Sequence, residues 1–290
     1  MNGQTTIMIS RASMNQNELD VIRIAESSTR SKYTRRQFKS MFGISSHVAA
    51  IVWKEMQKDN NVVGRNIGLK DFLMMLHFLK TYSTETVLCN AFGCTEKTFR
   101  GKYKKALSIV AHLPVICWER RHVHGNENDI AKVSIDGTDC EINEPSPWDS
   151  KWYSHKFHGA GLRYEIGVCI VTGHIVWVGG GDPAGTPDIT IAREGILNLL
   201  DDDETLIADG GYKGEEKIWC KGHCKFLSRM ESVVRARHET VNTRLKFFAV
   251  LKQKFRHDLH LHPMCFHAVA NLVQLDIAHE SPLFQIEYSE

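Results

Sequence analysis

The chain has 290 residues, of which 42% are hydrophobic and 24% are charged, a composition typical of a soluble globular protein. This length is enough for two domains or for one large domain. No apolar run approaches the roughly 18 residues that a membrane span requires, and residues 1–10 lack the apolar core of a secretion signal. We therefore expect an intracellular protein without a membrane partner.

The formal net charge of +2 conceals a difference between the two halves of the chain. Residues 1–130 hold 19 Lys and Arg against 11 Asp and Glu, whereas residues 131–290 hold 17 against 23. A basic front half indicates a polyanionic partner, although a charge difference between domains is also common without one. An acidic back half that approaches DNA would need cations, and a metal site would supply some of them.

The front of the chain is predicted to be all helical from residue 31 to residue 115. Residues 1–30 are polar, without strong cues, and are expected to be partly disordered. Apolar residues then recur with the period of a helix, and Pro114 suits a helix stop. The predicted helices cover residues 34–42, 46–57, 69–82, 84–92 and 95–111, and residues 116–130 form a connector.

A helix–turn–helix unit is predicted over residues 84–107. Gly93 stands at the turn, where a left-handed backbone suits glycine, and Thr95 can cap the second helix. The exposed side of that helix carries the basic residues that phosphate contacts need: Lys97, Arg100, Lys102, Lys104 and Lys105. The alternative is a helical hairpin with a solvated basic face. Residues 34–57 resemble a weaker second unit, for which packing is the simpler role.

From residue 131 the apolar pattern changes to the period of strands. Strands are predicted at 131–142, 164–171, 174–178 and 205–208, with a hairpin turn at 172–173 and a glycine-rich loop at 179–185. Helices are predicted at 188–200, from about residue 228 to residue 256, and at 263–279. The fold class is α/β, with residues 131–290 forming a mixed sheet flanked by helices behind the helical front.

Three acidic residues of this back half stand in unusual places. Asp136 interrupts an apolar strand, where a carboxylate is costly unless it is paired or binds a cation. Asp209 ends a short strand just before two glycines, a common position for a ligand site. Glu239 lies within a long basic helix. Taken singly, each also has an ordinary explanation, as a turn or cap residue or as half of an ion pair.

Carboxylates from separate elements are the ligands that Mg²⁺ uses when it keeps several of its waters. Two such ions about 4 Å apart can activate an attacking hydroxyl and stabilise the leaving oxygen of a phosphodiester. The trio therefore favours metal-dependent phosphodiester chemistry, with Asp136, Asp209 and Glu239 as both catalytic and metal-binding residues.

The segments around these carboxylates carry a family resemblance. In order they are Asp136-Gly137-Thr138, residues 151–157 (KWYSHKF), residues 161–166 (GLRYEI), residues 208–214 (ADGGYKG) and residues 237–246 (RHETVNTRLK). This series resembles the DDE transposases of the PIF/Harbinger-like superfamily, which has relatives among bacterial insertion-sequence transposases. The resemblance covers roughly residues 70–278.

The resemblance implies a ribonuclease-H-like core behind a DNA-binding region, with Asp136, Asp209 and Glu239 holding two Mg²⁺ ions, for which Mn²⁺ can substitute. The implied reaction is hydrolysis at the ends of a DNA element, followed by strand transfer by the freed 3′-hydroxyl. The expected partners are double-stranded DNA, a second copy of the chain in a homodimer and, as in some members, a Myb-like accessory protein. In a eukaryote the expected location is the nucleus.

Two features depart from the family pattern. Only 29 residues separate Asp209 from Glu239, which is short for this group, and Glu231 is a rival third carboxylate eight residues earlier. Asp188 matches an acidic family position without an assigned role. The long helix carries basic residues that could contact phosphates or could form a solvated face: Arg235, Arg237, Arg244 and Lys246.

Three alternatives stay open. One is a domesticated transposase that binds DNA without cutting it, and another is a two-metal nuclease outside transposition. Structural zinc is the third, suggested by Cys220 with Cys224 and by the histidines and Cys265 of residues 257–267, although neither spacing matches a zinc knuckle. The eight cysteines, at positions 89, 94, 117, 140, 169, 220, 224 and 265, are otherwise expected to be buried thiols in an intracellular chain.

Overall fold

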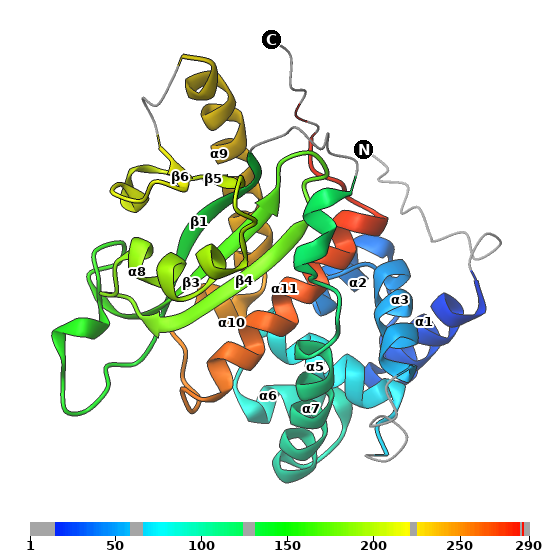
Figure 1. Cartoon of the computed structure of the whole chain (residues 1–290). Coiled ribbons are helices and arrows are strands. Elements are labelled where there is room, and N and C mark those ends of the chain that lie inside the picture. Colours follow the sequence, from blue (N-terminus) through cyan, green and yellow to red (C-terminus); the bar gives the residue numbers. More distant parts are fainter. Residues whose placement is uncertain (1–14, 59–65, 124–130, 221–224, 285, 287–290) are drawn as a thin grey trace, which may run out of the picture. The chain divides into compact units, whose positions relative to one another are not determined.

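The computed structural model describes residues 15–58, 66–123, 131–220, 225–284 and 286, with the backbone alone for 225–231. Figure 1 shows the helices and strands of the whole chain. The chain divides into two compact units. Met1–Leu113, Phe247–Val250 and Met264–Asp276 form the helical unit, and Pro114–Lys246, Leu251–Pro263 and Ile277–Glu290 form the sheet unit. Within the described residues, no helix combines the length and the apolar character that crossing a membrane requires.

The helical unit confirms the predicted helices of the front half. Its helices are α1 (Gln16–Thr29), α2 (Arg35–Phe42), α3 (Ser46–Gln57), α5 (Leu69–Thr81), α6 (Glu85–Phe92) and α7 (Glu96–Ala111). Thr34, Ser45 and Thr95 cap α2, α3 and α7 by accepting backbone hydrogen bonds, and Gly43 and Gly93 end α2 and α6 in the left-handed conformation. These local signals explain why the predicted bounds of these helices agree with the observed bounds to within two residues.

Helix α1 was not expected. Asn15 caps it, and Val21, Ile22 and Ala25 bury one apolar stripe. Glu18 is also buried there, and its Oε1 accepts a hydrogen bond from the hydroxyl of Ser46 at 2.7 Å. This tertiary contact provides a hydrogen-bond partner for the Glu18 carboxylate, which from the sequence alone would be expected at the surface. Residues 1–14, also assigned to the polar N-terminus, lie outside the described residues.

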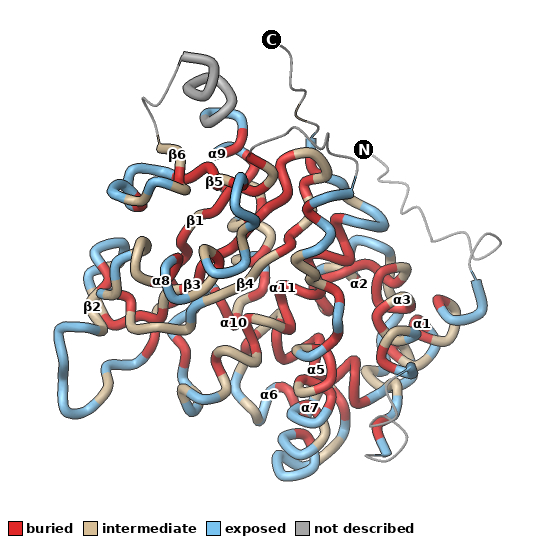
Figure 2. The backbone as a smooth tube through the Cα atoms, viewed as in Figure 1, coloured by how far each residue is buried: buried red, intermediate tan, exposed pale blue. Residues whose placement is uncertain are grey.

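The core of the helical unit forms around α5, whose side chains from Asp71 to Leu79 are all buried. The ring of Phe78 stacks on that of Tyr103 in α7, with centroids 4.2 Å apart. Helix α11 (Leu261–His279) contributes its Met264–Asp276 stretch to this unit, and Figure 2 shows that stretch as largely buried. This stretch was predicted to lie in one domain with the rest of residues 131–290, but contacts such as that of Asn271 Nδ2 with Val110 O, at 2.9 Å, join it to the front helices.

The sheet unit contains a six-stranded mixed sheet in the described residues. Its strands are β1 (Ala131–Glu141), β2 (Tyr153–Ser154), β3 (Gly159–Cys169), β4 (Ile175–Pro183), β5 (Thr205–Ile207) and β6 (Ile218–Trp219). Strand β3 pairs antiparallel with β1 on one side and with β2 and β4 on the other, whereas β5 and β6 continue from β1 as parallel strands. This confirms a mixed sheet flanked by helices.

Several boundaries in this unit differ from the prediction. Strand β4 continues through the predicted glycine-rich loop to Pro183, because Gly179 and Gly180 pair with β3. Glycine is required at 180, since a Cβ there would lie only 2.6 Å from the carbonyl oxygen of Arg163. The predicted helix at 188–200 is interrupted at Gly195, between α8 (Asp188–Glu194) and a 3₁₀ turn, Ile196–Leu199. The long helix α9 (Lys225–Lys246) stops at Lys246, ahead of the short α10 (Ala249–Lys252), and does not reach residue 256.

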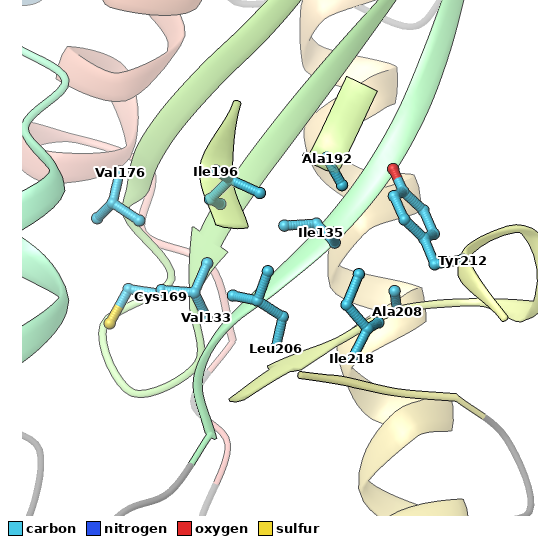
Figure 3. Close-up of a cluster of buried hydrophobic side chains, with 10 residues drawn as sticks. All are labelled: Val133, Ile135, Cys169, Val176, Ala192, Ile196, Leu206, Ala208, Tyr212 and Ile218. Atoms are coloured by element: carbon cyan, nitrogen blue, oxygen red, sulfur yellow. The ribbon is translucent and has the colours of Figure 1, made fainter. Parts of the chain in front are cut away.

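The two faces of β1 point to different parts of the unit. Val133 and Ile135 enter an apolar cluster with Ala192 and Ile196, from the α8 side, and with Leu206 on β5 (Figure 3). Because successive side chains of a strand point to opposite faces, Ser134 and Asp136 point the other way, toward α9. The apolar cluster thus secures the strand whose opposite face carries the first predicted carboxylate.

Candidate functional site

A cavity of about 420 Å³ lies within the sheet unit, between β1, the end of β5 and α9. All three carboxylates predicted from the sequence line it, although they are far apart in the chain. Its lining residues are Ile135, Asp136, Gly137, Thr138, Asp139, Lys156, Ile207, Ala208, Asp209, Val234, Arg235, His238, Glu239, Asn242 and Lys246.

Asp136 is half-buried in the middle of β1. Its Oδ2 accepts a hydrogen bond from the amide Nδ2 of Asn242 on α9, at 3.0 Å. Burial raises the pKa of Asp136 to about 6; the nearby Asp209 raises it as well, while Lys156 and Asn242 lower it. A cation placed between Asp136 and Asp209 would relieve this repulsion.

Asp209 follows β5 and caps a 3₁₀ turn, Gly210–Tyr212. Its Oδ1 accepts a hydrogen bond from the backbone nitrogen of Gly211 at 2.8 Å, which fixes an otherwise exposed carboxylate. A Cβ at Gly211 would lie 3.1 Å from that oxygen and 2.9 Å from Oδ2 of Asp188. Glycine is therefore needed here, and Tyr212 anchors the turn in the apolar cluster of the sheet unit.

Helix α9 presents one face to the cavity. Residues 235, 238, 239, 242 and 246 recur at the three- and four-residue spacing of a single helical face, and all of them line the cavity. Glu239 is exposed and lies three residues before Asn242, the partner of Asp136. Its rival Glu231 lies eleven residues before Asn242, roughly 16 Å along a helix axis, and its side chain is outside the described part of the structure. The helix geometry therefore favours Glu239.

His238 fastens α9 to β1 beneath the cavity. Its Nε2 and the hydroxyl of Ser134 lie 2.8 Å apart, and both residues are buried. Burial lowers the pKa of His238 to about 4, so the imidazole is neutral at neutral pH. Its role in the structure is to hold the helix that carries Glu239.

Sequence reasoning missed a buried network at the far end of β1. Asp139 accepts hydrogen bonds from Arg163 Nε at 2.8 Å and from the hydroxyl of Ser154 at 2.5 Å. Burial raises the pKa of Asp139, but these bonds outweigh burial and hold the pKa below its ordinary value. Asp139 and Arg163 are direct partners in the β1–β3 register. Their cross-strand ion pair could have been predicted from the sequence only if that register had been known.

Asp188 lies close to this region but does not line the cavity. Its carboxylate packs over Gly137, where a Cβ would lie 2.5 Å from Oδ1, and it forms an ion pair with Arg163 at 3.4 Å. Burial raises the pKa of Asp188, against the effect of Arg163. Asp188 therefore contacts the glycines that follow two of the site carboxylates, Gly137 and Gly211.

The predicted phosphate-binding residues of α9 fall on different faces. Arg235 is exposed and lines the cavity. Arg237 is only 1% exposed, and its guanidinium donates to the carbonyl oxygens of Cys169, Ile170 and Phe284. Arg244 donates to the carbonyl oxygen of Ser281, and the ammonium of Lys246 donates to those of Asp139 and Leu251. These bonds occupy Arg237, Arg244 and Lys246 within the fold.

The predicted basic residues of α7 are more accessible. Lys97, Lys104 and Lys105 are exposed, whereas Lys102 forms an ion pair with Asp71 at 3.2 Å. Arg100 is exposed as well and pairs with Glu85 of α6. The turn that joins these two helices contains Gly93 in the left-handed conformation. DNA contact by this helix stays a prediction.

A compact metal site needs at least three His, Cys, Asp or Glu side chains with their ligand atoms close together. Within the described residues, only His122, Asp201 and Glu204 form such a group, with ligand atoms within 4.8 Å of one another. Arg121 already occupies that position, because its Nε donates to Glu204 at 3.0 and 3.1 Å. The residues suggested for zinc do not converge in the described part of the chain, and Cys224 lies outside it. The described cysteines are free thiols.

Asp136, Asp209 and Glu239 do not meet this 4.8 Å criterion, so they are spread more widely than the ligands of one tightly enclosed ion. Two Mg²⁺ ions about 4 Å apart, each with oxygen ligands about 2.1 Å away, span roughly 8 Å. The candidate ligands in the cavity are the carboxylate oxygens of Asp136, Asp209 and Glu239, which suit hard cations. In chemical type these residues fit divalent metal ions.

The comparison with protein families addresses this segment directly. Residues 135–274 match the family described as DDE superfamily endonuclease. The match covers slightly less than half of the chain and contains Asp136, Asp209 and Glu239. It supports placing this segment in the DDE superfamily, a group of transposases and nucleases. No curated protein and no solved structure matches the chain significantly.

Proposed function

We propose that the protein is a DDE transposase that cuts DNA phosphodiester bonds at element ends and joins the freed 3′-hydroxyls to target DNA. The observation that carries the proposal is the convergence of Asp136, Asp209 and Glu239, from β1, the end of β5 and α9, on one cavity inside the segment that matches the superfamily. In this proposal the three carboxylates hold two divalent ions, Mg²⁺ or in its place Mn²⁺.

The bound ions would supply an activated oxygen nucleophile and stabilise the leaving oxygen of the phosphodiester. The residues of the chain orient the carboxylates that hold them. Asn242 fixes the rotation of the Asp136 carboxylate, Gly211 fixes that of Asp209, and the His238–Ser134 bond holds α9 against β1. Such fixed placement reduces the reorganisation that the reaction requires.

The finer features of the proposal rest on other observations. The mixed sheet, antiparallel from β4 to β1 and parallel from β1 to β6, supports a ribonuclease-H-like core. The α6–α7 pair around Gly93, with exposed lysines on α7, supports a helix–turn–helix that contacts double-stranded DNA. A place within the PIF/Harbinger-like group, a homodimer, a Myb-like accessory protein and a nuclear location in a eukaryote are further parts of the proposal that rest on the resemblance alone.

Nicking of supercoiled plasmid in Mg²⁺ or Mn²⁺ tests the proposal. We expect the wild-type protein to nick, chelation of the metal to stop it, and Asp209→Asn to slow it by at least about 100-fold while duplex binding persists. Asp202→Asn is the matched control, because Asp202 is an exposed acid of the same unit that does not line the cavity.

Two results would contradict the proposal. Wild-type nicking rates in Asp209→Asn would remove the carboxylates from the chemistry. Duplex binding by a wild-type protein that nicks in neither metal would instead support the alternative, a transposase-derived DNA-binding protein without cleavage.

A further inference from the structure

Lys156 is the one cavity residue that comes from the turn between β2 and β3. Its ammonium donates a hydrogen bond to the carbonyl oxygen of Gly137 at 2.9 Å, which places the charge one residue from Asp136. Its side chain is nevertheless 57% exposed. The charge therefore lies at the edge of the cavity beside the proposed metal ligands, and solvent or a ligand can reach it.

The turn that carries Lys156 is held in place by buried groups. Ser154 donates to Asp139, and the same hydroxyl accepts a hydrogen bond from the backbone nitrogen of Lys156 at 3.2 Å. Asp139 is in turn bound by Arg163. The chain from Asp139 through Ser154 to Lys156 fixes the backbone from which the ammonium reaches the cavity.

Lys156 forms only a long ion pair with Asp139, and its charge also favours the ionised form of Asp136. Both oxygens of Asp139 already accept hydrogen bonds from Arg163 and Ser154, and the Lys156 ammonium stays 4.0 Å from Oδ1. An ammonium has three N–H donors, and the bond to Gly137 uses one of them. The position thus combines a fixed backbone, an accessible charge and donors that suit an oxyanion.

Lys156 also differs from the other cations of the cavity. The ammonium of Lys246 is held by the carbonyl oxygens of Asp139 and Leu251. Arg235 lies on α9, on the helical face of Glu239, whereas Lys156 comes from the turn between β2 and β3 and reaches the backbone of β1 at Gly137. A phosphate that reached ions held between Asp136 and Asp209 would therefore come close to Lys156.

We propose that the ammonium of Lys156 binds a non-bridging oxygen of the DNA phosphate that is cut in this cavity. This inference rests on the proposed function and adds a substrate-binding residue to it. The lysine would offset the charge that builds on the phosphate oxygens during cleavage. It would not be a metal ligand, because an ammonium has no lone pair to donate.

Lys156→Ala should slow plasmid nicking by roughly 10- to 100-fold, the range expected when one charge-assisted hydrogen bond is lost. Binding of a fluorescein-labelled duplex in Ca²⁺ should weaken, and the slope of log affinity against log salt should become shallower by about 0.9, as for one lost phosphate contact. Mn²⁺ affinity without DNA, measured by titration calorimetry, should stay the same or increase, because a positive charge next to the ligands has been removed.

Lys151→Ala is the matched control. Lys151 belongs to the same segment, its side chain is 58% exposed, and it pairs with Asp149 at 3.0 Å outside the cavity. This variant loses the same charge at almost the same exposure, so it should nick and bind DNA like the wild-type protein. Lys156→Arg, which keeps the charge, should retain most of the activity, and Lys156→Met, which keeps the aliphatic stem, should behave like Lys156→Ala.

Each of the following outcomes would overturn the inference. Wild-type nicking by Lys156→Ala, or equal losses in Lys151→Ala, would remove the specific contact. A fall in Mn²⁺ affinity that matches the loss of nicking would assign Lys156 to the metal site instead. If Lys156→Ala fails to fold, equal activity of Lys156→Met and Lys156→Arg overturns it. A wild-type protein that neither binds duplex nor nicks plasmid would overturn the proposed function itself, and this inference with it.

Discussion

Replacing Glu165 with Gln is expected to stabilise the protein at neutral and alkaline pH while leaving its stability in acid unchanged. Glu165 lies on β3, is only 1% exposed, and accepts a hydrogen bond from the indole nitrogen of Trp177 at 3.1 Å. Burial raises the pKa of this carboxyl from its ordinary value of 4.5 to about 7, against the bond from Trp177, which lowers it. A glutamine retains the oxygen that Trp177 needs and cannot ionise.

The sign and the size follow from proton linkage. The unfolded chain releases the Glu165 proton near pH 4.5, whereas the folded protein keeps it to about pH 7. The stability associated with this proton is therefore fully present below pH 4.5 and is lost as the pH rises through 7. At 1.36 kcal/mol for each pKa unit, the loss approaches about 3 kcal/mol above pH 7. The glutamine variant should avoid this loss.

Urea denaturation of both proteins between about pH 4.5 and pH 8 measures the effect. The free energies of unfolding should agree at the acid end and diverge toward alkaline pH, where the variant should also melt roughly 5–10 °C higher. Glu144→Gln, at an exposed position, is the control and should stay within about 0.5 kcal/mol of the wild type. A stability difference that does not change with pH would refute the reasoning, because it would trace the effect to packing and not to the proton.

Two further predictions concern the basic residues. Arg237→Met should lower the free energy of unfolding by about 3 kcal/mol, because three carbonyl oxygens lose their donor. DNA binding by the folded fraction should not change. A stable variant with weakened DNA binding would contradict this. The double variant Lys104→Ala, Lys105→Ala should bind duplex DNA more weakly, and its slope of log affinity against log salt should be shallower by about 1.8. Arg35→Ala on α2 is the control and should change neither quantity. Unchanged binding by the double variant would remove α7 from the interface.

The front helices could be predicted because their limits are local. A capping side chain such as Thr34 or Thr95 contacts the backbone three residues ahead, and Gly43 and Gly93 end their helices through their own backbone conformation. Helix α1 was missed although Asn15 caps it in the same way, because the segment is polar and its buried Glu18 is satisfied only by Ser46, 28 residues later.

The errors in the back half share a tertiary origin. The glycines at 179–181 predict a loop, yet Gly179 and Gly180 pair with β3 and continue β4, and the backbone of β3 leaves no room for a side chain at Gly180. Helix α9 ends where the Lys246 ammonium meets the carbonyl oxygens of Asp139 and Leu251. Neither contact leaves a trace in the local pattern of residues.

The candidate site was accessible from the sequence to the extent that its residues conflict with their surroundings. Asp136 in an apolar strand and Asp209 before two glycines are such conflicts. Glu239 is not, since a glutamate in a basic helix is ordinary, and only the family resemblance selected it. Lys156 offered no conflict either, because its proposed role depends on a turn whose position is fixed by the ion pair of Asp139 and Arg163.

The basic residues of α9 show why charge alone misleads on a helix. Arg235 and Arg237 are two residues apart, which on a helix of 3.6 residues per turn places them roughly 200° apart. Arg235 accordingly lines the cavity while Arg237 is buried among backbone carbonyls. With Lys246 engaged by carbonyls as well, the positive charge that faces the three carboxylates comes chiefly from Arg235 and Lys156. Residues 131–290 carry 23 acidic against 17 basic residues. DNA bound at this cavity should therefore depend on divalent cations more strongly than DNA bound at α7, where exposed lysines supply the charge directly.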